Sequence, residues 1–184
     1  MSAIEGVSAG APLFARVLGS AFDVLPGSVQ RLHLRAGQAT YTGQVSVVRG
    51  TRLLARLCAW TTRLPPAGDM PIRVDIDASE RSEQWTRRVG CHAMRSHLWT
   101  ANGLLCERLG LVTFGFQLST EDSHLTWRVV RVRALGVPLP ASLFSEVSAR
   151  EGETQDGRYT FDVRAALPLI GPLVHYQGWL CVEH

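Results

Sequence analysis

The chain has 184 residues, of which 46% are hydrophobic, and a formal net charge of +3. This length suits one domain with a proper core, so we predict a single domain over 1–184, with 1–11 as a flexible lead-in. All 19 basic residues are arginine, and the lack of lysine excludes Schiff-base chemistry and the lysine of a phosphate-binding loop. The arginines are spread along the sequence and often lie beside acids, which favours a solvated surface and no nucleic-acid partner.

The cysteines and the hydropathy pattern narrow the class further. The four cysteines form no CxxC pair, so zinc-site spacing is absent, and we expect neither a metal nor a cofactor. No apolar run approaches the length of about 18 residues that a membrane span needs, and no signal-peptide pattern is present. We therefore expect a cytoplasmic protein with free thiols and no membrane span.

The first part of the chain has helical periodicity. Pro12 suits the first turn of a helix, and apolar residues recur at spacings of three and four up to Phe22. The sequence LPGS at 25–28 ends this helix and can cap a second, short helix that extends to His33. A third, amphipathic helix is predicted at 51–63, before a pair of prolines.

The rest of the chain alternates apolar and polar residues, as β-strands do. Asn102-Gly103 is a strong hairpin signal, because both positions tolerate a positive φ. We predict about nine antiparallel strands, at 38–47, 72–77, 84–89, 94–99, 111–119, 125–135, 144–154, 158–166 and 173–182. The predicted fold is α+β, with N-terminal helices followed by a long curved antiparallel β-meander that forms an open or closed barrel-like sheet around a cavity.

Four segments resemble a known family. They are PLFARVLGSAFDVLP at 12–26, WTRRVG at 85–90, LGVPLP at 135–140 and DGRYTFDVRAALPLIGPLVHYQGWL at 156–180. In these segments the chain resembles the bacterial domains of unknown function called DUF4166, with differences in detail such as Gln177, where the family pattern has arginine. Such domains occur alone or behind a saccharopine-dehydrogenase-like domain, and the resemblance implies no general activity. No GxGxxG motif follows a strand, so nucleotide binding does not carry over.

The last predicted strand holds the main candidate for catalysis. Alternation places His175, Gln177 and Trp179 on one face and Tyr176 on the other. His175 can serve as a general base or as a donor to a ligand carbonyl. It can equally be a wall residue that hydrogen bonds to a neighbouring strand or to a buried acid. Both interpretations stay open at this stage.

Acidic residues provide candidate partners for this histidine. Glu107 and Asp162 are the two that we nominate as catalytic acids or bases, since a desolvated carboxyl group has a raised pKa. Asp162 is flanked on its own face by Arg158, four residues before it, and by Arg164, two residues after it. A structural ion-pair ladder is therefore the favoured alternative for Asp162.

Candidate ligand-binding residues come from strands on which both faces carry large groups. On 125–135 one face presents Trp127, Val129, Arg131 and Arg133, and the other is not plainly polar either. A ligand-enclosing barrel has such strands, although arginine stems that cover an apolar face explain the same pattern. The nominated ligand-binding residues are Trp127, Arg131, Trp99, His97, Tyr176, Gln177 and Trp179.

These patterns, without metal, nucleotide or nucleophile motifs, lead to a functional prediction. We predict a cofactor-independent domain that binds an apolar or polyketide-like small molecule, with a cyclase or isomerase of secondary metabolism as its active form. Such an enzyme would hold a reactive chain folded and polarise a carbonyl. The alternative is a non-catalytic carrier of a lipid or other hydrophobic ligand, or a docking partner of a dehydrogenase. A homodimer also stays open.

Overall fold

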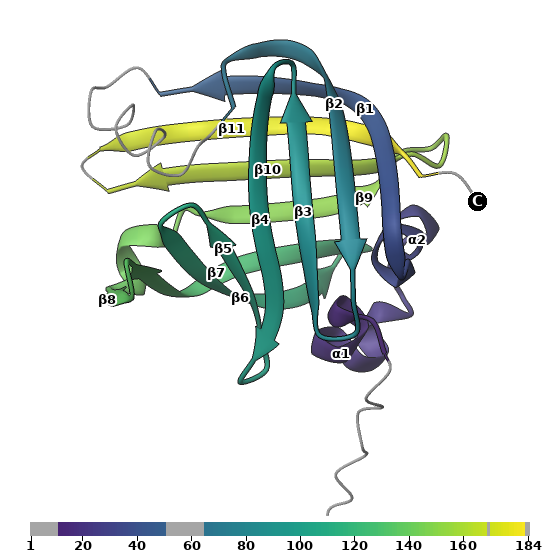
Figure 1. The fold of residues 1–184 in the computed structure, drawn as a ribbon, viewed down its shortest axis with the longest axis horizontal. Helices are drawn as coiled ribbons and strands as arrows, with labels where there is room; N and C mark the ends of the chain where they lie inside the picture. Colours follow the sequence, from purple (N-terminus) through teal and green to yellow (C-terminus); the bar gives the residue numbers. More distant parts are fainter. Residues whose placement is uncertain (1–10, 51–64, 169, 183–184) are drawn as a thin grey trace, which may run out of the picture.

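A computed structural model describes residues 11–50, 65–168 and 170–182, so the helix predicted at 51–63 lies outside the described residues (Figure 1). Near its start the chain forms α1 (Leu13–Leu18), the 3-10 helix η1 (Gly19–Phe22) and α2 (Gly27–Leu34). The helical periodicity up to Phe22 and the short helix to His33 are thus confirmed. Within the described ranges, no helix has the length and apolar character that crossing a membrane requires.

Most of the remaining described residues form antiparallel strands. The strands are β1 (Gly37–Arg49), β2 (Gly68–Ala78), β3 (Ser82–Val89), β4 (His92–Ala101), β5 (Leu104–Leu109), β6 (Val112–Glu121), β7 (His124–Ala134), β8 (Val137–Leu139), β9 (Ser148–Glu153), β10 (Tyr159–Leu167) and β11 (Gly171–Cys181). A second 3-10 helix, η2 (Ala141–Phe144), precedes β9.

These strands close into a barrel. Strands β1 to β7 pair in chain order, β7 pairs with β9, and β9, β10 and β11 lead back to β1. The short strand β8 pairs only with the C-terminal part of β7. The predicted barrel-like antiparallel sheet is confirmed, and its closed form is the one observed. In the described ranges the class is mostly β and not α+β, because α1, η1 and α2 are short and pack against one end of the barrel (Figure 1).

Three details of the predicted strands are corrected. The strand β5 was not predicted, because Leu105, Cys106 and Glu107 are all buried and their alternation is therefore hidden. The strand β8 was not predicted either, and the strand predicted at 144–154 is limited to Ser148–Glu153. Its first residue belongs instead to η2, which begins after Pro140.

A bulge in the β6–β7 pair changes which residues face inward. Gly115 pairs with Arg131 and Phe116 pairs with Val129, so Val130 is an extra residue on β7. Before the bulge Val129 is buried, and after it Arg131 is exposed. The prediction that Arg131 shares a face with Trp127 is therefore wrong.

The two N-terminal helices close one end of the barrel (Figure 1). Phe14 of α1 is fully buried and its ring lies 3.6 Å from the His33 ring of α2 and 5.4 Å from that of Trp127 on β7. The backbone N–H of Ser28 donates a hydrogen bond of 2.6 Å to Glu153 Oε2 on β9, which ties the start of α2 to the wall. Burial of the apolar side chains of α1 and α2 thus holds the two helices over this end of the barrel.

Two glycines allow the first and last strands to approach closely where the barrel closes. Gly43 on β1 pairs with Leu180, and Gly178 on β11 pairs with Val45. A Cβ atom at Gly43 would collide with the backbone of Trp179, and one at Gly178 would collide with the backbone of Gln44. Any side chain here would force the two strands apart.

We expect the Gly43→Ala substitution to destabilise the protein by roughly 2–4 kcal/mol, because the added methyl group meets backbone atoms that cannot rotate away. Chemical denaturation would measure this loss. The control is Gly27→Ala in α2, where the methyl group meets the end of the flexible Arg31 side chain and makes an ordinary contact with Glu153 Oε2, and where alanine favours the helix. Equal stability of the two variants would contradict a steric role for Gly43.

Candidate functional site

The barrel encloses a cavity of about 80 Å³. Aromatic and aliphatic side chains make most of its wall, and several polar groups interrupt them. The lining residues come from β2, β3, β5, β6, β7, β9, β10 and β11: Ile72, Val74, Trp85, Arg87, Glu107, Phe116, Trp127, Ala149, Glu151, Tyr159, Phe161, Val163, Tyr176 and Leu180. The polar members of this set are the candidate functional residues.

A buried ion pair forms one side of the cavity. Arg87 Nη1 lies 3.3 Å from Glu107 Oε1 and donates a second hydrogen bond of 2.8 Å to Ser96 Oγ. The guanidinium group also lies over the Trp85 ring, 4.7 Å from its centroid. Burial acts to lower the pKa of Arg87, but the charge of Glu107, the nearby Tyr176 and Tyr159 and the hydrogen bond to Glu107 together outweigh it and raise that pKa. Arg87 therefore stays charged and its charge is balanced locally.

A second buried chain of polar groups connects α2 to the cavity. His33 Nε2 lies 2.7 Å from Glu151 Oε2, and both side chains are almost fully buried. The hydroxyl group of Tyr159 forms a hydrogen bond with Glu151. Burial, followed by the nearby charge of Glu151, raises the pKa of Tyr159 well above its ordinary value. Tyr159 therefore remains a neutral hydrogen-bond donor over the physiological pH range.

Two further polar groups line the cavity. Burial raises the pKa of Tyr176 to about 12, so its hydroxyl group is also protonated at neutral pH. Trp127 is 4% exposed, and its indole Nε1 has no hydrogen-bond partner within the described ranges. A buried donor without a partner costs free energy, and a ligand oxygen could remove that cost. The cavity thus presents hydrogen-bond donors between aromatic walls.

His175 and Asp162 lie outside the cavity, on the outer surface of the barrel. His175 Nε2 lies 3.1 Å from Asp162 Oδ1, and the histidine side chain is 36% exposed. Arg164 Nε is 3.0 Å from the same carboxyl group. Partial burial acts to raise the pKa of Asp162, but the hydrogen bonds and charges of Arg164 and His175 outweigh it and lower that pKa. The geometry is that of a surface ion-pair cluster.

The ion-pair ladder that was predicted around Asp162 forms in part. Arg164 pairs with Asp162, as expected. Arg158 instead pairs with Asp156 at 2.9 Å, and its guanidinium group lies 4.3 Å from the centroid of the Trp179 ring. Trp179 is therefore engaged on the outer surface.

The structure separates the nominated residues into two groups. Glu107, Trp127 and Tyr176 line the cavity. The others lie on the outer side of the barrel, and three of these line an open surface groove of about 620 Å³: Asp162, Gln177 and Trp179. The remaining ones are His175, His97, Trp99 and Arg131. On β11 both faces carry large side chains, so alternation alone could not tell which face is the inner one.

Three residues of the cavity and its polar chain were missed: Arg87, Tyr159 and His33. A usable signal existed for two of them. Arg87 lies on the apolar face of its strand, which it shares with Trp85 and Val89. His33 lies on the buried face of its helix, one turn after Val29. A charged or titratable residue on an apolar face points inward and needs a partner. The sequence of a single strand does not identify that partner.

The described residues contain no group of three or more His, Cys, Asp or Glu side chains arranged to hold a metal ion. The fold and the cavity define a class: a closed antiparallel barrel with a polar cluster inside it. The family model with the description "Domain of unknown function (DUF4166)" matches residues 25–180, and the chain belongs to this family. The search of curated proteins returned no match. The resemblance seen in the sequence is thus confirmed.

All three tyrosines have a raised pKa, and each is raised first by burial. We therefore expect tyrosinate absorbance in the folded protein to stay low at a pH of about 10, where unfolded tyrosines titrate. Because the folded state favours the protonated phenol, the stabilisation is complete below that pH and is lost as the pH rises toward the folded pKa values. A spectrophotometric titration with and without denaturant measures this. Half-titration of the folded protein near the ordinary tyrosine pKa would contradict it.

Proposed function

We propose that the barrel binds a small neutral molecule that carries a carbonyl group on an apolar or aromatic body, the chemistry of a polyketide-like ligand. The observation that carries the proposal is the partnerless Nε1 of Trp127, in a residue that lines the same cavity as Tyr176 with its protonated hydroxyl. A carbonyl oxygen accepts hydrogen bonds from such donors, and the aromatic walls suit the rest of the ligand.

The charges around the cavity favour a neutral ligand over an acid. Glu107 already balances the charge of Arg87, and Glu151 adds a second carboxyl group to the wall. A ligand carboxylate would have to share the cavity with these two acids, in an environment where burial of an unpaired charge is costly. A carbonyl group meets no such penalty.

The size and the opening of the cavity limit how the ligand lies. A volume of about 80 Å³ is small beside the roughly 300–1,000 Å³ of pockets for drug-sized ligands. Phe161, Val163 and Tyr176 line the cavity and are partly exposed to solvent. We infer that the carbonyl end of the ligand enters past these residues, and that a longer body requires Phe161 to move aside.

An enzymatic role is supported by the position of Glu107. A carboxylate beside hydrogen-bond donors can remove a proton from the carbon next to a carbonyl, while the donors stabilise the oxygen that becomes negatively charged. In this scheme Glu107 is the base, and Trp127 and Tyr176 bind the enolate oxygen. Enolisation of this kind is the step that an isomerase and an aldol-type cyclase share. A carrier would bind the same ligand and leave it unchanged.

Binding can be tested with acetophenone, which joins one carbonyl group to one aromatic ring. We expect Trp127→Phe and Tyr176→Phe each to weaken binding about threefold to tenfold, as loss of one neutral hydrogen bond predicts. Titration followed by NMR measures this affinity. Trp99→Phe, on the outer surface, is the matched control and should bind as the wild type does. Binding that is insensitive to both cavity variants would reject the proposed site.

The enzymatic role requires a separate measurement. Exchange of the methyl protons of acetophenone for deuterium in D₂O, followed by NMR, reports enolisation. We expect the wild type to catalyse this exchange and Glu107→Gln to lose it while still binding the ketone, because the amide keeps the shape but is not a base. Binding without exchange in the wild type would assign the carrier role instead.

A further inference from the structure

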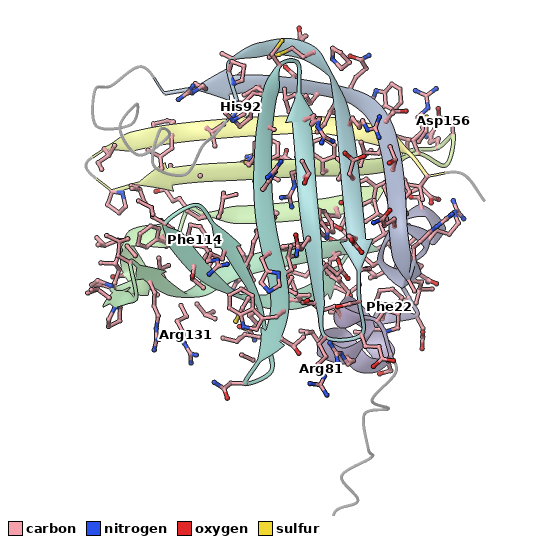
Figure 2. The ribbon with its side chains drawn as sticks, in the orientation of Figure 1. Phe22, Arg81, His92, Phe114, Arg131 and Asp156 are labelled. Atoms are coloured by element: carbon pink, nitrogen blue, oxygen red, sulfur yellow. The ribbon has the colours of Figure 1, made fainter. Side chains whose placement is uncertain are left out.

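A second candidate site lies on the outer surface of the barrel, away from the cavity. Strand register aligns two neighbouring rows of side chains across β4, β5, β6 and β7. We call these eight residues the arginine patch: His97, Arg108, Thr113 and Arg133 in one row, and Trp99, Cys106, Gly115 and Arg131 in the next. Figure 2 shows Arg131 at the outer edge of the molecule.

The patch is positively charged and contains no acidic residue. Arg108, Arg131 and Arg133 are exposed, and none of them forms an ion pair with another residue in the described parts of the chain. Arg128, which precedes the bulge in β7, adds a further exposed guanidinium group. Some outward arginines elsewhere differ, since Arg73 and Arg164 are each held by an aspartate.

Arginines that are distant in the sequence meet in this patch. Arg108 and Arg133 are joined through Thr113, which pairs with both. Arg131 and Arg133 lie on the same face of β7, roughly 7 Å apart along the strand. These arginines are spread along the sequence, but strand pairing brings them together on this face. Their spacing in the sequence is therefore no argument against an anionic partner.

An aromatic platform lies beside these charges. The rings of His97 and Trp99 are stacked, with centroids 5.4 Å apart and an angle of 27° between their planes, and both residues are partly exposed. In the row of Trp99 the next two positions are Cys106 and Gly115, which are small. Both small residues are buried, and Leu104 Cδ1 lies 3.3 Å from the position that a Cβ atom of Gly115 would take, so a flat group can reach only the exposed part of the aromatic pair.

We propose that the arginine patch binds single-stranded nucleic acid, with a base stacked on Trp99 and the adjoining phosphates held by Arg108, Arg131 and Arg133. Guanidinium groups match phosphate oxygens as planar, permanently charged donors. Stacking platforms beside a basic surface are the features with which proteins bind unpaired strands. An acidic protein surface would use the arginines but not the aromatic pair. This site is independent of the proposed cavity function.

The test is fluorescence anisotropy with a labelled oligodeoxythymidylate of about 12 nucleotides, a length within the usual site sizes. We expect salt-sensitive binding by the wild type. Arg131→Gln with Arg133→Gln should weaken binding about tenfold and reduce the slope of log K against log salt by roughly 1.4, or 0.7 for each phosphate contact. Trp99→Leu should weaken binding at least fivefold, since stacking contributes about 1–3 kcal/mol per base.

The matched control is the double variant Arg73→Gln with Arg164→Gln, which removes the same charge from β2 and β10. Apart from the modest effect of the lower net charge, this control should change the affinity less than about twofold. An equal loss in the control would show that only overall charge matters and would overturn the site. Absence of oligonucleotide binding at low salt would overturn it too. So would tighter binding to polyglutamate or to vesicles with phosphatidylserine. Circular dichroism confirms that each variant is folded.

Discussion

The pairing of β11 with β1 is the constraint on which the rest of the structure depends. It joins residues as far apart as Thr42 and Cys181, and it converts a long antiparallel sheet into a ring with an inside and an outside. Closure also removes the two sheet edges that an open meander would expose. The strands can come together only because Gly43 and Gly178 have no side chains at the crossing. Together with the bulge in β7, this contact decides which residues face the cavity and which face the surface.

The polar groups inside the ring are not explained by stability alone. The Arg87–Glu107 pair loses hydration on burial, and apolar residues of similar volume often make a core as stable or more stable. The pair is supported by Ser96 and by the Trp85 ring, so its geometry is fixed before any ligand arrives. The chain from His33 through Glu151 to Tyr159 is fixed in the same way. Preorganised groups of this kind are what a binding or catalytic site requires.

The sequence predicts the strands well, because alternation is a local property. The turn at Asn102-Gly103 is where the hairpin signal placed it, with positive φ at both residues. The inner face is harder to predict, because it is decided by closure between distant strands. His175 and Tyr176 are neighbours on β11, yet one lies on the surface beside Asp162 and the other lines the cavity. Glu107 could be nominated from its apolar neighbours, whereas its pairing with Arg87 depends on the register of β3, β4 and β5.

The bulge at Val130 shows how one extra residue serves both surfaces. Without it, strict alternation would place Arg131 and Arg133 on the same face as Trp127, inside the barrel. Two more guanidinium groups would then enter an interior where Glu107 is already paired, and their burial would be costly. With the bulge, Val129 and Val132 both pack inward while the arginines turn outward beside Cys106 and Gly115. The inward packing of Val132 beyond Trp127 and Val129 and the outward position of Arg131 and Arg133 are therefore consequences of the same local irregularity, and a regular β7 could not combine them.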